Sequence, residues 1–281
     1  MDLAPQPPVF NYVVTNISGT PPANPGTGFT AVSVAAPDAA GVTCITLTAD
    51  IYRLAVDIGG IAATGVDANA VLDVLYDPGG GTPATVAIPS LIAGFTNVQA
   101  TTGALFSQSY LFPLRLPSGS TVGVRARGAS GTPITTGFVA MTALGKPSYP
   151  VWAGQKVVAI GMNAATAMGT IITPDATAAP TTWANLGTLA GNAGGAIQIS
   201  INGSDSAASA RAYYAQVGIS SNVIPGTETI AKFISSTEGG VAYGPRTEMF
   251  CNIPDGSLLQ VRAGCSGTVE NINMGAWVTY R

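Results

Sequence analysis

The sequence predicts an all-β protein made of two tandem antiparallel β-sandwich domains, jelly-roll-like in type and related by an internal duplication. Three observations predict it. Apolar and polar residues alternate with a period of two along many short segments, which is typical of half-buried antiparallel strands. Turn sequences rich in Gly, Pro, Asn and Asp separate these segments. Finally, a stretch from the middle of the chain recurs near its end.

The recurring stretch is a strand–turn–strand unit. "LPSGSTVGVRARGASGT" from Leu116 reappears as "IPDGSLLQVRAGCSGT" from Ile253, so that Arg125 matches Arg262. Weaker pairs keep nearly the same offset, among them "IPSLIAGF" and "IPGTETIAKF" in the two halves. The 281 residues are therefore accounted for by two copies of about 137 residues each, a length that suits an eight-stranded jelly roll.

The matched arginines lie on the polar side of their predicted strands. In the first copy Val122, Val124 and Ala126 form the apolar side, and Arg125 and Arg127 alternate with them. Two interpretations remain open for Arg125 and Arg262. They belong to a solvated or inter-domain face of a sheet, or they share a role in docking a partner.

In chain order, we expect a Pro-rich N-terminal arm over residues 1–24, a first sandwich over 25–145, a linker over 146–152 and a second sandwich over 153–281. The linker is stiff because prolines and aromatic residues are dense in "LGKPSYPVW". Proline denies the arm a helix and most ladder hydrogen bonds. Its apolar residues still need burial, either as the first strand of the first copy or against a neighbouring subunit. We therefore name Phe10, Tyr12 and Val13 as candidate docking residues.

Composition excludes several classes of function. Only 9% of residues are charged, whereas an ordinary soluble domain has about 25%. The net charge of −3 and the absence of basic runs argue against nucleic-acid binding. The chain has no histidine, which removes the commonest general base and a frequent zinc ligand. From the sequence we expect no signal peptide, no membrane-spanning stretch and no membrane partner.

The remaining polar residues select no catalytic, cofactor-binding or metal site, so we expect no enzyme and no cofactor. Four acids of the first copy either bind Ca²⁺ or, in the favoured interpretation, cap turns: Asp57, Asp67, Asp73 and Asp77. The odd number of cysteines favours buried thiols at Cys44, Cys251 and Cys265, with a Cys251–Cys265 disulfide as the alternative. Trp277 belongs either to the core or to a sugar-binding platform.

Motifs over residues 57–140 carry a resemblance to a known group of proteins. "DIGG" from Asp57, "IPSLIAG" from Ile88 and "YLFPLRLPSGSTVGVRARG" from Tyr110 follow one another there. With them the chain resembles tailed-bacteriophage virion proteins in which a "DIG" strand, an "IPNLL"-like segment and an "FP-x-x-IPAG" hairpin recur. The second copy keeps only the hairpin, in "MFCNIPDGSLLQVRA". The resemblance implies a non-enzymatic structural protein on the exterior of the particle: a capsid decoration protein, a head fibre or a tail-associated protein.

Two other functions stay open at this point. One is a virion adhesin that binds host-surface polysaccharide, and the other is a major capsid protein with two jelly rolls in one chain. In each case the partners we expect are other virion proteins, further copies of this chain in a trimer or ring, and in the adhesin a host-surface glycan. The expected location is the virion, assembled in the host cytoplasm.

Overall fold

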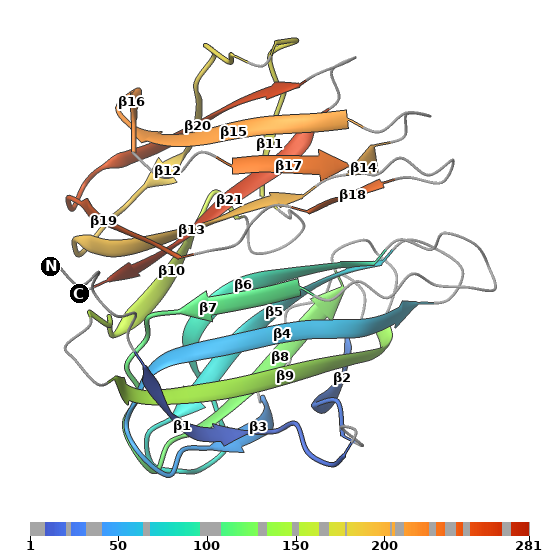
Figure 1. Ribbon diagram of the computed structural model, residues 1–281, viewed down its shortest axis with the longest axis vertical. Helices are drawn as coiled ribbons and strands as arrows, with labels where there is room; N and C mark the ends of the chain where they lie inside the picture. The colour runs from blue at the N-terminus through green and yellow to red at the C-terminus, as the bar shows by residue number, and fades with distance from the viewer. Residues whose placement is uncertain are drawn as a thin grey trace, which may run out of the picture.

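The protein is all-β, as the sequence predicts (Figure 1). We describe it from a computed structural model. The described residues are 9–20, 24–31, 41–63, 68–95, 108–128, 134–147, 152–162, 169–177, 179–202, 204–205, 211–224, 229–233, 240–243, 248–265 and 271–280. These ranges contain no helix, and hence no helix that could cross a membrane.

The first copy contains two antiparallel sheets, which we call sheets I and II. Sheet I has the order β1-β9-β4-β7, and β2 also pairs with β9. Its strands are β1 (Phe10–Thr15), β2 (Thr27–Ala31), β4 (Ile51–Ala63), β7 (Gln108–Phe112) and β9 (Ile134–Pro147). Sheet II has the order β3-β8-β5-β6. Its strands are β3 (Val42–Thr46), β5 (Ala68–Asp77), β6 (Thr85–Phe95) and β8 (Thr121–Gly128).

The second copy contains sheets III and IV. Sheet III has the order β10-β21-β13-β19, and β11 also pairs with β21. Its strands are β10 (Lys156–Ile160), β11 (Thr170–Ile172), β13 (Gly194–Asn202), β19 (Met249–Ile253) and β21 (Ile272–Tyr280). Sheet IV has the order β12-β20-β15-β17-β18-β14, with β16 paired to β15. Its strands are β12 (Ala184–Thr188), β14 (Ser204–Asp205), β15 (Arg211–Ile219), β16 (Asn222–Val223), β17 (Thr229–Phe233), β18 (Gly240–Tyr243) and β20 (Leu258–Cys265).

The two copies have the same strand order, which confirms the duplication. In sheets I and III a long strand, β9 or β21, pairs on one side with two short edge strands, and on the other with β4 or β13. In sheets II and IV the orders β3-β8-β5-β6 and β12-β20-β15-β17 correspond strand for strand. A β-bulge recurs as well. β3 shifts its register against β8 at the same place where β12 shifts its register against β20.

The duplicated hairpin is held by the same hydrogen bonds in both copies. The Gly119 amide donates to the Leu47 carbonyl, and the Leu47 amide donates to Ser120, both at 2.8 Å. In the second copy Gly256 and Ser257 make the matching pair with Leu189, both at 2.9 Å. Both turn glycines have positive φ, 83° and 77°, a conformation that L side chains disfavour. The Pro-Ser/Asp-Gly-Ser sequence is therefore conserved between the copies for a backbone reason.

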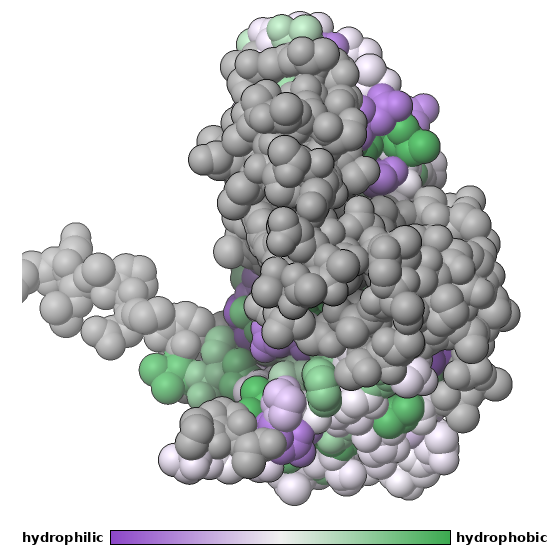
Figure 2. All heavy atoms as spheres, turned by 90° about the vertical axis from the view of Figure 1, so that its right-hand side faces the viewer, coloured by the Kyte–Doolittle hydropathy of each residue, from purple (hydrophilic) through white to green (hydrophobic). Residues whose placement is uncertain are grey.

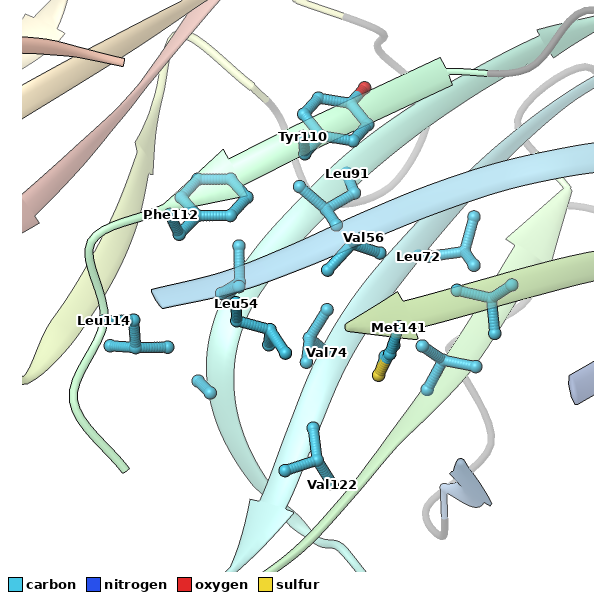
Figure 3. Close-up of a cluster of buried hydrophobic side chains, with 14 of the residues drawn as sticks. Leu54, Val56, Leu72, Val74, Leu91, Tyr110, Phe112, Leu114, Val122 and Met141 are labelled. Atoms are coloured by element: carbon cyan, nitrogen blue, oxygen red, sulfur yellow. The ribbon is translucent and has the colours of Figure 1, made fainter. Parts of the chain in front are cut away.

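The core of the first copy lies between sheets I and II. Alternate residues of the central strands point into it, and Figure 3 shows Leu54 and Val56 from β4 meeting Leu72 and Val74 from β5. All four are fully buried. A second core fills the space between sheets III and IV, with Ile197, Ile199 and Ile201 from β13 among its members. Period-two alternation predicts both groups correctly.

The two copies share a seam, at which the second copy contributes to the core of the first. Trp277 of β21 and Val157 of β10 both belong to the first core. The Trp277 ring lies edge-on to Tyr110 and Phe112, at centroid distances of 5.2 and 6.4 Å. Its indole N–H donates to the Pro89 carbonyl at 2.8 Å. Trp277 is thus a core residue, so the alternative of a sugar platform is wrong.

Backbone hydrogen bonds also cross the seam. The Gly154 amide donates to the Pro113 carbonyl, and the Arg115 amide donates to the Gly154 carbonyl, each at 2.7 Å. A Cβ at Gly154 would lie 1.9 Å from the Tyr280 carbonyl oxygen, so only glycine allows this approach. Residues 148–151 of the predicted linker lie outside the described residues, and the predicted domain boundaries stay predictions.

Candidate functional site

The first matched arginine, Arg125, forms an ion pair within its own sheet. Its Nε lies 2.9 Å from the Asp73 carboxylate, and β5 and β8 place the two residues directly opposite each other. Asp73 also accepts the Ser90 amide at 2.9 Å. The exposed fractions of the Arg125 and Asp73 side chains are 20% and 8%. Arg125 therefore neutralises a buried carboxylate.

The second matched arginine, Arg262, has the same position with different chemistry. Its partner across the ladder is Gln216, whose Oε1 accepts the Arg262 Nε–H at 2.7 Å. The guanidinium also lies 4.8 Å from the centre of the Trp183 ring. The duplication thus keeps an arginine paired with a polar residue of the neighbouring strand, and changes that residue from Asp73 to Gln216.

One part of the expectation for this face is wrong. Arg127 is only 5% exposed, and burial lowers its pKa. Thr121 and Gly123 are buried as well. β8 is therefore covered on both faces, whereas the sequence predicts a strand with one face exposed to solvent. The docking role proposed for Arg125 and Arg262 stays a prediction, although both guanidinium groups already have partners inside the sheet.

The three candidate residues of the arm lie together on β1, the edge strand of sheet I. β1 pairs with β9, which matches the interpretation of this segment as the first strand of the first copy. Tyr12 is 63% exposed, whereas Val13 packs partly against the first core. Phe10 lies under the Arg53 guanidinium, 4.6 Å from its ring centre. Their docking role stays a prediction as well.

The described surface has one hollow beside β1 and another where the first copy meets Gln155 of the second. A hollow of about 410 Å³ is lined by Asn11, Tyr12, Tyr52 and Lys146, with Asp50 at its border. Asp50 also borders a second hollow of about 300 Å³. The further lining of the second hollow includes Tyr76, Arg115 and Gln155. The two hollows are therefore adjacent.

The ridge between the hollows is a stack of charged and aromatic side chains. The Arg115 guanidinium lies 5.6 Å from the centre of the Tyr52 ring and 3.5 Å from the Asp50 carboxylate. The Ser118 amide donates to Asp50 at 2.9 Å, and this bond, together with Arg115, lowers the pKa of Asp50. The carboxylate is thus ionised and fixed. Arg115 and Asp50 are about half exposed.

A buried ion pair joins the two copies. Arg53 of β4 pairs with Glu248, which immediately precedes β19 of the second copy. Their side chains are 12% and 9% exposed. Burial raises the pKa of Glu248 to about 7, although Arg53 opposes the shift. The Arg53 guanidinium also contacts Phe250, whose ring meets Trp152 edge-on.

The cysteines are free thiols, so the alternative of a Cys251–Cys265 disulfide is wrong. Cys265 is buried, and Cys44 and Cys251 are half-buried. Burial raises the pKa of both Cys44 and Cys251 to about 11, which keeps them protonated and poorly nucleophilic at neutral pH. They act as small apolar residues.

Two of the acids considered as Ca²⁺ ligands, Asp73 and Asp77, have separate structural roles. Asp77 caps its turn by accepting the Gly79 and Gly81 amides at 3.0 and 2.6 Å. Asp73 pairs with Arg125, as above. Asp67 lies outside the described residues. Within the described ranges, no group of three or more acids and cysteines gathers as for a metal ion.

Comparisons with known proteins give only distant likenesses. No protein-family model and no curated protein matches the sequence. Among solved structures, the chain is similar to a peptide-N(4)-(N-acetyl-β-D-glucosaminyl)asparagine amidase, with 11% identity, a TM-score of 0.32 and coverage of 97% of this chain and 95% of that chain.

Two viral proteins are also similar. One is from the T=1 particle of a Penaeus vannamei nodavirus, with 11% identity, a TM-score of 0.21 and coverage of 99% and 98%. The other is from the Gx strain of infectious bursal disease virus, with 10% identity, a TM-score of 0.21 and coverage of 97% and 73%. With scores this low, none of these likenesses transfers an activity or a partner to this chain.

Sequence reasoning therefore found one side of the hollowed surface and missed the other. The sequence predicts Tyr12 as a docking residue of the arm, but it does not point to Asp50, Tyr52 or Arg115. Arg115 does stand out within "FPLRLPSG" as a charged residue between two leucines, and that contrast is the signal that could have found it.

Proposed function

We propose that the chain is a non-enzymatic structural protein of a virus particle, and more specifically of a bacteriophage. In this proposal it lies on the particle exterior as a capsid decoration, head-fibre or tail-associated protein. It is assembled in the host cytoplasm, and its partners are other virion proteins and further copies of itself in a trimer or ring.

One observation carries the proposal: the described parts of the resembling motifs serve the architecture. Leu116–Ser120 form the hairpin tied to Leu47, and Tyr110 and Phe112 build the seam with Trp277. The Tyr110 hydroxyl donates to the Ile92 carbonyl and so joins sheet I to sheet II. A catalytic motif would instead present activated groups to a cleft. Motifs that fix the shape of two joined β-sandwiches are suited to a structural subunit of a larger particle.

The surface is compatible with packing against other subunits in an assembly. On the face in Figure 2, the coloured residues in the lower half of the molecule, which belong to the first copy, mix apolar and polar types. Exposed large apolar side chains include Val9, Tyr12, Val42, Ile171 and Phe250. With only 9% charged residues, little repulsion keeps such surfaces apart.

The test is to find and count the chain in purified particles. Mass spectrometry of gradient-purified virions from the source lysate should identify it, and gel densitometry should give its copy number. We expect hundreds of copies for a decoration or capsid protein and about a dozen or fewer for a tail or fibre protein. Absence from washed particles, with the chain recovered only in the soluble fraction, would contradict the proposal.

A further inference from the structure

We infer that the two adjacent hollows around Asp50 form a binding site for an oligosaccharide. Together they offer about 410 and 300 Å³ beside each other, room for more than one sugar unit. This inference deepens the adhesin alternative. It is tested on the isolated chain, so its failure is distinguishable from a failure of the particle role.

The lining has the chemistry that sugars require. A sugar ring presents apolar C–H faces and a rim of hydroxyl groups that both donate and accept hydrogen bonds. Three tyrosines line the hollows, Tyr12, Tyr52 and Tyr76, and a tyrosine ring combines an apolar face with a polar tip. Planar polar groups that bond neighbouring hydroxyls in pairs stand between them, from Asp50 and Arg115.

The groups on the ridge are already oriented, which limits the entropy lost on binding. Arg115 is held between the Tyr52 ring and the Asp50 carboxylate, and Asp50 is held by the Ser118 amide. Each retains about half of its surface exposed to a ligand. In the described parts of the chain, Lys146 at the rim of the larger hollow has no ion-pair partner. It is available to a ligand that carries a carboxylate.

The second copy shows that the fold does not need these residues. Its hairpin is tied by the same backbone bonds, yet Asn252 replaces Arg115 two residues before the hairpin proline. On β15, Ile219 stands where β5 has Tyr76. The two positions correspond because they pair with Val122 and Leu259, each the second residue after the hairpin serine. The hydrogen bond from the Ser118 amide to Asp50 has a counterpart with the two loops exchanged. In the second copy the hairpin residue Asp255 accepts the Gly191 amide at 2.8 Å. The first copy therefore carries an aromatic and charged surface beyond what its architecture requires.

The experiment probes the full chain on a microarray of bacterial capsular and O-antigen oligosaccharides, with neutral and uronic-acid members, followed by calorimetric titration of the best binder. The variants are Tyr12→Ala and Arg115→Ala, and the matched control is Ile171→Ala, an equally exposed apolar residue on β11 of the second copy. Thermal melting checks that each variant is folded.

We expect the wild type and Ile171→Ala to bind the same oligosaccharide, and each site variant to bind it about tenfold more weakly, the loss typical of one charged hydrogen bond for Arg115→Ala and of one aromatic contact for Tyr12→Ala. Uronic-acid members should bind best, because Lys146 and Arg115 outnumber Asp50. The inference is overturned if the wild type binds no oligosaccharide, if both site variants bind as the wild type does, or if the control loses binding as well.

Discussion

At the residue scale, the duplicated arginines show how one position serves two chemistries. Arg125 faces a carboxylate that is 8% exposed, and Arg262 faces a neutral amide. A buried charge that loses its partner destabilises a protein far more than an amide that loses one hydrogen bond. The two copies therefore provide a matched pair of mutations within one chain.

We predict that Arg125→Ala destabilises the protein by about 2–3 kcal/mol, because the buried Asp73 carboxylate loses its ion-pair partner. Arg262→Ala should cost about 1 kcal/mol for the lost hydrogen bond, plus a smaller amount for the lost contact with Trp183. Urea unfolding at pH 7 measures both. Equal losses, or a larger loss for Arg262→Ala, would show that Asp73 does not depend on Arg125.

Sequence reasoning reached the apolar side of these strands but not the polar side. Alternation alone identifies Val122, Val124 and Ala126 as core residues. It says nothing about what covers the other side, because the partner of Arg125 lies on β5, far away in sequence. The burial of Arg127 could not be predicted for the same reason. The hollows around Asp50 were hidden likewise, since Tyr12 and Arg115 are far from Asp50 in sequence and come near it only in the folded protein.

At the element scale, the hairpin turn is a backbone requirement that recurs. Both turn glycines have positive φ, and a Cβ at either would meet no atom within 4 Å. Any effect of a side chain there is therefore conformational strain alone.

Gly119→Ala and Gly256→Ala should each cost about 1 kcal/mol, because left-handed strain of about 1–2 kcal/mol is partly offset by the lower entropy of the unfolded chain that carries alanine. Asn at either position should cost less, because it tolerates this conformation. Denaturant midpoints of the four variants provide the measurement. If alanine is free of cost at one turn and costly at the other, the two hairpins are not equivalent.

The first strand permits a second prediction at this scale. β1 pairs with β9, and the Thr15 hydroxyl and Asn16 amide bond the backbone of β9 as well. A chain that starts at residue 23 should therefore melt several degrees earlier than the full chain. A truncated chain that melts normally but no longer attaches to particles would instead assign residues 1–22 to docking.

At the scale of the whole molecule, the seam makes stability depend on pH. The pKa of Glu248 is raised from 4.5 in the unfolded chain to about 7 in the folded one, chiefly by burial. Between these values the folded state binds more protons than the unfolded state. The contribution of this group is therefore full at acid pH and declines as the pH rises toward about 7.

Glu248→Gln should remove that contribution. The stability of the wild type relative to this variant should fall as the pH rises from about 5 through 7, and should level off about one pH unit above the folded-state pKa. Urea unfolding of both proteins across the range measures the difference. Parallel pH profiles would mean that Glu248 does not titrate in this window.

The central claim of this account is that two copies of one sandwich form a single body with a shared core, a shape suited to a building block. Its most direct test is the denaturant unfolding of the wild type and of Trp277→Ala, followed both by tryptophan fluorescence and by far-UV circular dichroism. The wild type should unfold in one transition with the same midpoint for both probes. Trp277→Ala should lose about 3–5 kcal/mol and separate the copies, so that the first unfolds earlier although the mutation lies in the second. Two separate transitions in the wild type, or an unchanged first copy in Trp277→Ala, would contradict the claim.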